Sequence, residues 1–412
     1  MPEVKPSEVE STASIKVIGV GGAGGSAVNR MREAGLNGVE FVAMNTDAQA
    51  LHNSKADIKV HLGHDTTNGL GAGADPTVGE RAADESREEI KNSLAGADMA
   101  FITLGAGGGT GSGAGYVVAE EARKQDILTV GVVTKPFSFE GQKRKANADW
   151  GIERLARNVD ALITIPNDRL LQTIDQRTPI VEAFKIADDV LRQGVQGISE
   201  LITEHGLVNL DFADVRAIMK DAGSALMGIG RASGENRATI AAQQAIESPL
   251  IEVSIDGARG VLLSVIGGYD LSMAEVSEAA ELVTSSISPD ANIIWGAAIR
   301  PELEDEVIIT VVATGFDSQY YGNDPRAQQD MYVSDLRNSA EMSAPTQAAA
   351  DPVQTMPVEE PQQSADMQPE TQASAVFTNN DNVNMWDQIR NDSDDDDSDI
   401  PAILRRRKKN KD

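Results

Sequence analysis

The sequence contains no cysteine, which excludes disulfide bonds and thiolate-ligated metal sites. Aromatic residues make up only 4% of its 412 positions. No apolar run approaches the roughly 20 residues needed to cross a bilayer. The first residues, MPEVKPSEVESTAS, are polar and acidic and lack the basic and apolar segments of a signal peptide. These absences predict a cytoplasmic protein with no transmembrane insertion.

Positive charge is also scarce. The formal net charge is −28 at pH 7, so nucleic acid is not expected as a partner, and anionic lipid would repel most of the chain. The charge is unevenly placed: residues 317–398 hold 17 acidic and 3 basic side chains, whereas residues 399–412 hold 6 basic and 2 acidic ones. This reversal predicts a solvated spacer that ends in an attachment point.

The first part of the sequence alternates short β-rich runs with amphipathic helices. Several of these runs are continuously apolar, as in strands that are buried on both faces. Pro76 suits the first turn of a helix over Thr77–Leu94. The alternation predicts an α/β domain, with a parallel sheet and helices on both of its faces. The expected strands are Ile15–Val20, Val39–Met44, Ile58–Leu62, Met99–Leu104, Ile127–Val133 and Ala161–Ile165.

A long helix and a second, smaller domain are expected to follow. Residues 180–203 keep helical periodicity throughout, long enough for a strut between domains. Residues 317–398, which come after this second domain, are expected to be disordered. They hold 6 prolines and only 8 Leu, Ile, Val or Phe residues, and this is too little apolar surface to offset the entropy of ordering. The second domain is expected to be α+β, with strands near 250–256, 260–266, 292–299 and 306–314 and a helix over Met273–Ser285.

The predicted organisation therefore has seven parts. They are a disordered arm over 1–14, a nucleotide-binding domain over 15–179, the central helix over 180–203, a loop and helix over 204–221, the α+β domain over 222–316, a disordered acidic linker over 317–398 and a tail over 399–412.

A glycine-rich loop follows the first expected strand and leads into a helix. Gly19, Gly21 and Gly24 fit the pattern G-x-G-x-x-G, and Asp47 lies some twenty residues further on, as in dinucleotide-binding folds. Glycine matters here because side chains would keep phosphates away from the backbone N–H groups at a helix N-terminus. On this motif alone, a structural turn and a nucleotide-dependent oxidoreductase both stay open.

Two further glycine loops extend the pattern. Phe101–Gly115 reads FITLGAGGGTGSGAG, a buried strand that runs through a glycine tract into a helix. A simple dinucleotide fold needs one phosphate loop, so a second one indicates that a whole phosphate chain is wrapped. A third turn, Gly69–Asp75, precedes a helix and is suited to close over the terminal phosphate. No Gly-Lys pair occurs in the sequence, so a Walker A loop is absent, as is the N-K-x-D guanine motif.

These loops, with TKPFSFEG at 134–141 and NLDFAD at 209–214, make the sequence resemble the FtsZ family, the bacterial homologues of tubulin. The resemblance runs from about residue 15 to residue 315 and returns at 399–406, and GGGTGSG is specific to the tubulin superfamily. It implies a tubulin-like fold, in which a doubly wound parallel-sheet GTPase domain is joined by a long central helix to a smaller α+β domain. It also implies GTP or GDP as the nucleotide, with Mg²⁺, and head-to-tail polymerisation into filaments of the division ring.

The resemblance also implies which residues bind the nucleotide. From the residues alone, a core position is favoured for Phe184, because aromatic residues at helical spacing usually pack. The resemblance instead implies that Phe184 stacks on guanine and that Asp188 accepts hydrogen bonds from the base. The implied residues are Gly21, Gly22, Ala23, Gly24, Gly25, Ser26 and Asn29 in the first loop; Ala72 and Gly73 at the γ-phosphate; Gly108, Gly109, Thr110 and Gly111 at the other phosphates; Glu140 and Arg144 at the ribose; and Asn167, Phe184 and Asp188 at guanine.

The implied catalytic residues are Asp211 and Asp214, together with Asn209. In the family this loop reaches into the site of the next subunit, where carboxylates position and polarise the attacking water. From the residues alone, a helix N-cap followed by an acid in the first turn is the favoured interpretation. His61 and His64 are expected to be surface residues, and no protein metal site is predicted, because no third ligand is in view.

The tail carries the remaining implication. Asp399–Arg406 resembles the peptide through which the family binds membrane-tethering and regulatory division proteins, which would place filaments at midcell on the inner face of the membrane. Three other interpretations are weaker. An oxidoreductase leaves the second glycine loop unexplained, the tail argues against a tubulin relative that segregates plasmids or shapes cells, and Asp211 and Asp214 argue against a filament that does not hydrolyse its nucleotide.

Overall fold

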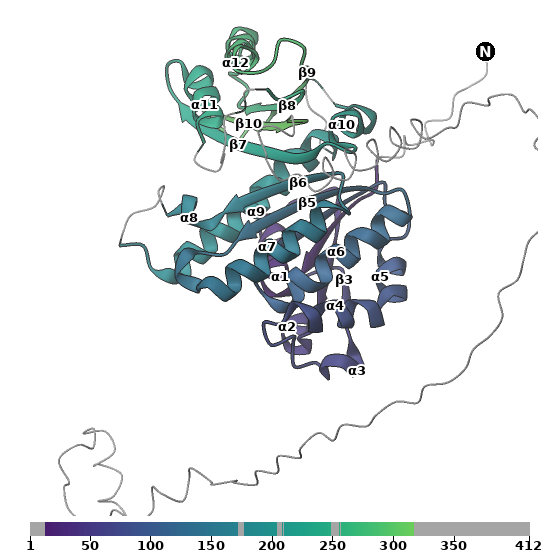
Figure 1. Cartoon of the computed structure of the whole chain (residues 1–412). Coiled ribbons are helices and arrows are strands. Elements are labelled where there is room, and N and C mark those ends of the chain that lie inside the picture. Colours follow the sequence, from purple (N-terminus) through teal and green to yellow (C-terminus); the bar gives the residue numbers. More distant parts are fainter. Residues whose placement is uncertain are drawn as a thin grey trace, which may run out of the picture. The chain divides into compact units, whose positions relative to one another are not determined.

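The computed structural model describes residues 13–171, 177–203, 208, 210–248, 255 and 257–316. Its strands are β1 (Ile15–Val20), β2 (Val39–Asn45), β3 (Ile58–His61), β4 (Met99–Gly105), β5 (Leu128–Lys135), β6 (Ala161–Pro166), β7 (Gly223–Ser233), β8 (Gly260–Gly267), β9 (Asn292–Ile299) and β10 (Glu306–Thr314). They form one sheet in the order β3-β2-β1-β4-β5-β6-β7-β10-β8-β9, of which Figure 1 shows the part from β5 through β6 to β7.

Helices connect and cover these strands. Their bounds are α1 (Gly21–Glu33), α2 (Ala48–His52), α3 (His64–Thr67), α4 (Pro76–Glu85), α5 (Arg87–Leu94), α6 (Gly109–Lys124), α7 (Gln142–Ala156), α8 (Asn167–Leu170), α9 (Ile180–Thr203), α10 (Phe212–Met219), α11 (Arg237–Ile246) and α12 (Met273–Ser285), with a short 3₁₀ turn η1 (Ser138–Glu140).

The first six strands confirm the predicted parallel sheet. Each of them pairs only in parallel with its neighbours among β1 to β6, and each predicted strand agrees with the observed one to within two residues. Because the strands are parallel, their carboxyl ends all lie at one edge of the sheet and their amino ends at the other. This polarity decides where every candidate site residue lies.

Both faces of the parallel sheet are buried, as the continuous apolar runs predict. On one face, Val17 of β1 packs with Val28 of α1 and Val195 of α9. On the other face, Ile18, the next residue of β1, packs in a cluster with Ile90 of α5 and residues of α4, α6 and α7. Successive strand residues point to opposite faces, so a single strand supplies both cores.

The predicted helix over Thr77–Leu94 is wrong in one respect, because it is two helices. Pro76 does lie in the first turn, but α4 ends at Glu85 and α5 begins at Arg87. The break falls on Ser86, whose Oγ accepts a hydrogen bond from the backbone N–H of Gly63 at 2.9 Å. The backbone of Ser86 has φ −102° and ψ 22°, which is outside the helical conformation. The partner is 23 residues away, so helical periodicity does not reveal it.

The later elements confirm part of the prediction. The central helix α9 has the predicted bounds, as do β9, β10 and α12. Strand β7 and helix α11 were not predicted. The small residues of β7, GSALMGIGRAS, obscure its apolar pattern. They allow α11 to lie directly on the strand, because a Cβ at Gly230 would lie only 1.8 Å from the carbonyl oxygen of Ala241. The strand predicted near 250–256 lies largely outside the described residues.

The sheet continues from the parallel part into the later part of the chain. Strand β6 joins β7 through only three residue pairs, beginning with Ala161 and Gly223, whereas β7 and β10 form nine antiparallel pairs. A separate core of β7 to β10 with α11 and α12 supports this second half. The narrow junction lies where β7 begins, at Gly223.

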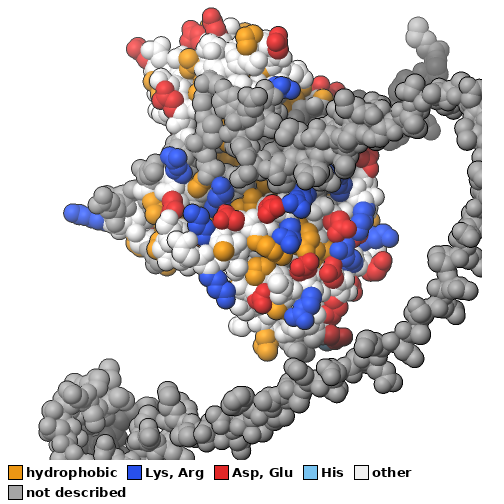
Figure 2. Space-filling view, viewed as in Figure 1, with side chains coloured by type: hydrophobic (Ala, Val, Ile, Leu, Met, Phe, Trp, Pro, Cys, Tyr) orange, Lys and Arg blue, Asp and Glu red, His pale blue; other side chains and the backbone are white. Residues whose placement is uncertain are grey.

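The predicted linker and tail, and all but two residues of the predicted arm, lie outside the described residues. Within the described part of the chain, no helix is long and apolar enough to cross a membrane. On the face seen in Figure 2, Lys and Arg side chains are interspersed with Asp and Glu rather than gathered in one basic patch.

Candidate active site

The first two glycine loops meet at the carboxyl edge of the sheet. Helix α1 begins at Gly21, directly after β1, and α6 begins at Gly109, shortly after the neighbouring strand β4. Gly21 has a left-handed backbone (φ +73°), and a Cβ there would lie 3.0 Å from the backbone nitrogen of Gly111. Only glycine allows this conformation and this close approach. The two loops therefore form one continuous surface.

The third loop closes against the second. A Cβ at Gly109 would lie 2.8 Å from the Cβ of Ala72 and 2.9 Å from the backbone nitrogen of Asp75. The loop is held on its other side by the segment after β2, because Gly71 N–H donates to the carbonyl of Thr46 at 3.1 Å and Ala48 N–H donates to that of Gly69 at 3.1 Å. All three predicted phosphate loops thus converge at one place.

Several of the described helices lack a side-chain cap at the N-terminus, and the helices that start in the first two glycine loops are among them. The first-turn N–H groups of α1 and α6 receive no side-chain cap, whereas aspartates cap α2, α4 and α10. The first four N–H groups of a helix have no partner inside it, and they bind anions well because the helix dipole is positive at that end. Two uncapped helix N-termini side by side suit a chain of phosphates.

A pocket of about 210 Å³ lies beside the first loop. Gly21, Gly22, Gly25, Ser26 and Asn29 line it, together with residues of β2 and α2. The side-chain oxygen of Asn29 accepts a hydrogen bond from Lys55 N–H at 2.6 Å. This contact holds Asn29 at the rim of the pocket.

Thr46 is a site residue that sequence reasoning missed. It is fully buried, and its hydroxyl lies 2.7 Å from that of Thr110 in the second glycine loop. Its carbonyl accepts from Gly71 of the third loop, so it connects two of the phosphate loops. The available signal was its position directly after a buried parallel strand, where ligand-binding residues gather in α/β folds.

The predicted ribose and base residues lie on a second group of loops. Glu140 accepts a hydrogen bond from Phe137 N–H at 2.9 Å and forms an ion pair with Arg144, which fixes the loop before α7. Asn167, at the start of α8, is 6% exposed, and its side-chain oxygen is buried without a hydrogen-bond partner. Such groups are rare in folded proteins, so this oxygen suits a ligand with an N–H donor.

Phe184 and Asp188 lie one turn apart on α9. The core position favoured for Phe184 is wrong, since the side chain is 42% exposed and meets the ring of Phe137 only edge-on, at 5.5 Å between centroids. Asp188 accepts a hydrogen bond from Arg30 Nε at 3.1 Å. Burial raises the pKa of its carboxyl group, and the Arg30 interaction opposes this.

The predicted catalytic aspartates do not join this group. Asp211 is the N-cap of α10, and its carboxylate accepts from Asp214 N–H at 2.9 Å, so the capping interpretation is confirmed. Asn209 lies outside the described residues. Arg216, two residues after Asp214, forms an ion pair with Asp126 at 3.1 Å, just before β5 begins. The aspartates are therefore at the amino edge of the sheet, roughly 20 Å from the glycine loops at about 3.3 Å per strand residue.

The two histidines differ in their exposure. His64 is exposed as predicted, but His61 is half-buried, and its Nε2 is buried without a hydrogen-bond partner. Among the residues that the structure describes, no three His, Asp or Glu side chains are grouped so as to hold a metal ion.

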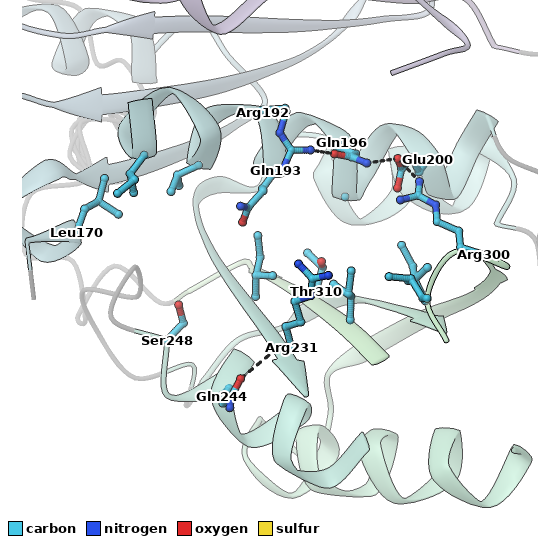
Figure 3. A pocket seen from close by; sticks show the side chains of 17 residues that line it. Leu170, Arg192, Gln193, Gln196, Glu200, Arg231, Gln244, Ser248, Arg300 and Thr310 are labelled. Carbon is cyan, nitrogen blue, oxygen red and sulfur yellow. Dashed lines mark hydrogen bonds and ion pairs between the residues drawn. The ribbon is translucent and has the colours of Figure 1, made fainter. Parts of the chain in front are cut away.

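A second cavity lies away from the glycine loops. It has a volume of about 580 Å³ and lies between α9 and the strands β7 and β10, as Figure 3 shows. Along its α9 wall, Arg192, Gln196, Glu200 and Arg300 form a continuous chain of hydrogen bonds and an ion pair. None of its lining residues lines the pocket at the first loop, so cavity size does not identify the phosphate site.

Known proteins match the chain along both halves. Residues 14–175 match the GTPase domain of the Tubulin/FtsZ family, and residues 223–317 match the C-terminal domain of the FtsZ family. A solved structure of an empty FtsZ dimer from M. jannaschii is 48% identical, with a TM-score of 0.72, and the match covers 74% of this chain and 89% of that one.

A solved structure of a mutant M. jannaschii FtsZ matches with the same identity and TM-score, over 75% of this chain and 93% of that one. The GDP-bound monomer of CetZ1 from Haloferax volcanii is 21% identical, with a TM-score of 0.65 over 79% of this chain and 99% of that one, and shares the fold. The three converging glycine loops are thus those of a tubulin-like GTPase domain, and the chain belongs to the FtsZ family of GTPases.

Proposed function

We propose that the chain hydrolyses GTP at a site completed by a second copy of itself, in filaments that form the cytokinetic ring at the division site. The observation that carries this proposal is the separation of the two halves of the site. The phosphate loops lie at the carboxyl edge of the sheet, and Asp211 and Asp214 lie at the amino edge, beside Asp126. One subunit cannot bring these carboxylates to its own nucleotide.

Stacking of subunits supplies the missing half. If the amino edge of one subunit lies on the carboxyl edge of the next, each Asp214 faces the phosphates of its neighbour. The two contacting faces are different, so the contact is heterologous, and it produces an open filament when the rotation does not close a ring. The solved M. jannaschii FtsZ dimer is consistent with self-association in this family.

Exposed apolar side chains support a contact at the nucleotide face. Leu70 of the third glycine loop is 87% exposed, and Val181, at the start of α9, and Phe139 are also exposed. On the segment that carries Asp211, Val208 is partly exposed as well. A contact that covered these side chains would remove apolar surface from water, which is favourable by about 25 cal/mol per Å².

The proposed roles at the nucleotide follow from the contacts. Backbone N–H groups of Gly21 to Ser26 and of Gly108 to Gly111 bind the phosphates, and Ala72 and Gly73 cover the γ-phosphate. Asn167 accepts from guanine, Phe184 stacks on it and Asp188 accepts from its N1–H and N2–H₂ groups. Glu140 and Arg144 lie at the ribose. A neighbour's Asp214, with Asp211, orients and polarises the attacking water.

Magnesium is proposed to accompany the nucleotide. The described residues offer no cluster of carboxylates and histidines for a metal, which fits a Mg²⁺ ion that keeps several waters and is bound mainly by phosphate oxygens. In that position it would neutralise charge on the phosphates. Thr110 carries a hydroxyl in the second phosphate loop, and this hydroxyl lies 2.7 Å from that of Thr46.

The tail completes the proposal, although it lies outside the described residues. Residues 399–406 read DIPAILRR, and we propose that they bind membrane-tethering and regulatory division proteins, with the linker over 317–398 as a flexible spacer. A neutral coil of 82 residues would have an r.m.s. reach of roughly 50 Å. The filament would then assemble in the cytoplasm, at midcell, beside the membrane that its partners occupy.

Phosphate release per subunit, measured against protein concentration, tests the proposal. If a neighbour completes the site, specific activity must fall towards zero on dilution, in step with the loss of light scattering. Asp214→Ala should bind GTP and form filaments that persist, with hydrolysis lower by about 10²-fold or more. Glu247→Ala is the matched control, because Glu247 is an exposed carboxylate that directly follows α11. Constant activity per subunit down to high dilution would mean that a monomer holds the whole site.

A further inference from the structure

An ion pair connects the phosphate-binding helix to the base-binding helix. Arg30 lies on α1, the helix that starts in the first glycine loop, and Asp188 lies on α9. Arg30 Nε and Asp188 Oδ2 are 3.1 Å apart, and the two side chains are only 30% and 19% exposed. The residues are separated by 158 positions in the sequence, so only the fold brings them together.

The proposed role of Asp188 makes two demands on its carboxylate. To accept hydrogen bonds from both N1–H and N2–H₂ of guanine it must be ionised and must present its oxygens in the plane of the base. Burial works against the first demand, because it raises the pKa of the Asp188 carboxyl group. Rotation about the side-chain bonds of Asp188 works against the second demand, because it turns the carboxylate oxygens out of the plane of the base.

Arg30 meets both demands. A guanidinium is always charged at neutral pH and donates in a fixed plane, and its hydrogen bond favours the ionised form of Asp188. A carboxylate has about four lone-pair sites on its two oxygens, so one can bind Arg30 while others remain for the base. The charge-assisted bond also limits the rotation of the carboxylate.

We propose that Arg30 is a positioning residue for guanine recognition, holding the carboxylate of Asp188 in the orientation that accepts from the base. This inference rests on the proposed role of Asp188 in base binding. Because Arg30 is on the helix whose first turn binds phosphate, it also fixes the distance between the phosphate subsite and the base subsite. The competing explanation is that Arg30 only braces α1 against α9, with no effect on which base is bound.

Base analogues distinguish the two explanations. GDP carries both donors, whereas IDP keeps N1–H and lacks the 2-amino group. We would measure equilibrium binding of GDP and IDP to the nucleotide-free full-length protein, for wild type, Arg30→Met and Arg30→Lys. Arg32→Met is the matched control, because Arg32 is on the same helix and forms an ion pair with Asp57 at 2.8 Å, away from the base. Thermal unfolding of each variant reports any loss of packing.

The proposal predicts that Arg30→Met weakens GDP binding about tenfold and IDP binding clearly less, so that the ratio of the two affinities falls. Arg30→Lys keeps the charge and should recover part of the ratio. With GTP at saturation, kcat of Arg30→Met should stay within about twofold of wild type while KM rises. Arg32→Met should leave both affinities unchanged.

Three results would overturn the proposal. If Arg30→Met lost GDP and IDP affinity equally, Arg30 would only brace α1 against α9. If neither affinity changed, Arg30 would have no role in base binding. Recovery of stability but not of base preference in Arg30→Lys would also count against it. Failure of the proposed base site itself would look different: wild type would then not prefer GDP over IDP, and Asp188→Ala would not change that preference.

Discussion

Arg216 of α10 forms an ion pair with Asp126, the Nη2 and Oδ2 atoms lying 3.1 Å apart. Asp126 lies just before β5, so this contact fixes α10 to the amino edge of the parallel sheet. Asp211 and Asp214, on the first turn of the same helix, are held there too. The glycine loops are at the carboxyl edge. The proposed division of the active site between two subunits is therefore a consequence of strand direction.

Asp211 is expected to have two separable roles, as a helix cap and as a catalytic carboxylate. Asp211→Ala removes the bond to Asp214 N–H and should lower the free energy of unfolding by about 1 kcal/mol. Asp211→Asn keeps a capping side chain of nearly equal strength but removes the charge. The asparagine variant should therefore unfold like wild type in denaturant and yet hydrolyse GTP at least about tenfold more slowly. If Asp211→Asn hydrolysed GTP at the wild-type rate, Asp211 would act only as a helix cap.

Asp188→Asn should change which base is bound. The asparagine amide would donate to the 2-carbonyl of xanthine, where the carboxylate of Asp188 accepts from the 2-amino group of guanine. We expect the ratio of XDP to GDP affinity to rise at least about tenfold, which is about 1.4 kcal/mol, measured by competition titration. ADP serves as the reference ligand, because its phosphates are the same and its base has no N1–H. An unchanged ratio would mean that Asp188 does not contact the base.

Stability at acid pH should depend on a cluster around Arg237. Glu275 has a pKa lowered to about 2, first by its hydrogen bond to Arg237 and also by bonds from Ser272. A depressed carboxyl pKa stabilises the folded state above the unfolded value of 4.5, and that stabilisation is lost as the pH falls from about 5 towards 2. Arg237 is buried and also pairs with Asp270 at 2.5 Å.

Thermal unfolding of wild type and Glu275→Gln at several pH values measures this effect. The difference in Tm should be largest near pH 7 and should shrink steadily below about pH 4.5, because wild type alone loses the stabilisation. Glu281→Gln, an exposed carboxylate on the same helix, should differ little from wild type at any pH. A difference that stays constant with pH would show that Glu275 stabilises by packing alone.

Deletion of residues 399–412 should separate assembly from attachment. We expect GTP hydrolysis and light scattering of the truncated protein to match the full chain, because the glycine loops and the aspartates of α10 are intact. Recruitment to membranes by a tail-binding partner should be lost, as measured by fluorescence of the labelled protein in cells. A matched variant, Ile403→Asp with Leu404→Asp, keeps the length and removes the apolar side chains. Membrane-attached rings of the truncated protein would refute the tether.

The features that could be predicted from the sequence are those that local chemistry determines. The glycine loops were predictable because close phosphate approach demands glycine, whatever the rest of the fold. The bounds of α9 were predictable because an amphipathic pattern continues over all 24 residues. The N-cap at Asp211 follows from a hydrogen bond that spans three residues.

The features that were missed depend on contacts between distant segments. Ser86, at the break between α4 and α5, accepts a hydrogen bond from Gly63, and the hydroxyl of Thr46 lies 2.7 Å from that of Thr110. Arg30 is an ordinary charged residue in the sequence and acquires its proposed role only beside Asp188. Phe184 was placed in the core by its spacing, but the helix presents it at the surface. Helical periodicity predicts which residues share one face of a helix, but it does not predict which other segment packs against that face.

Mixing two inactive variants tests the shared active site most directly. Asp214→Ala binds GTP but lacks the catalytic carboxylate, and Thr110→Arg keeps the carboxylate but blocks its own phosphate site. Cosedimentation first establishes that the second variant joins filaments of the first. Where its α10 faces a filled site, the junction is complete, so phosphate release should recover to at most about a quarter of the wild-type rate, since one of four pairings is competent. A mixture that cosediments but releases no more phosphate than the two variants alone would contradict an active site shared between subunits.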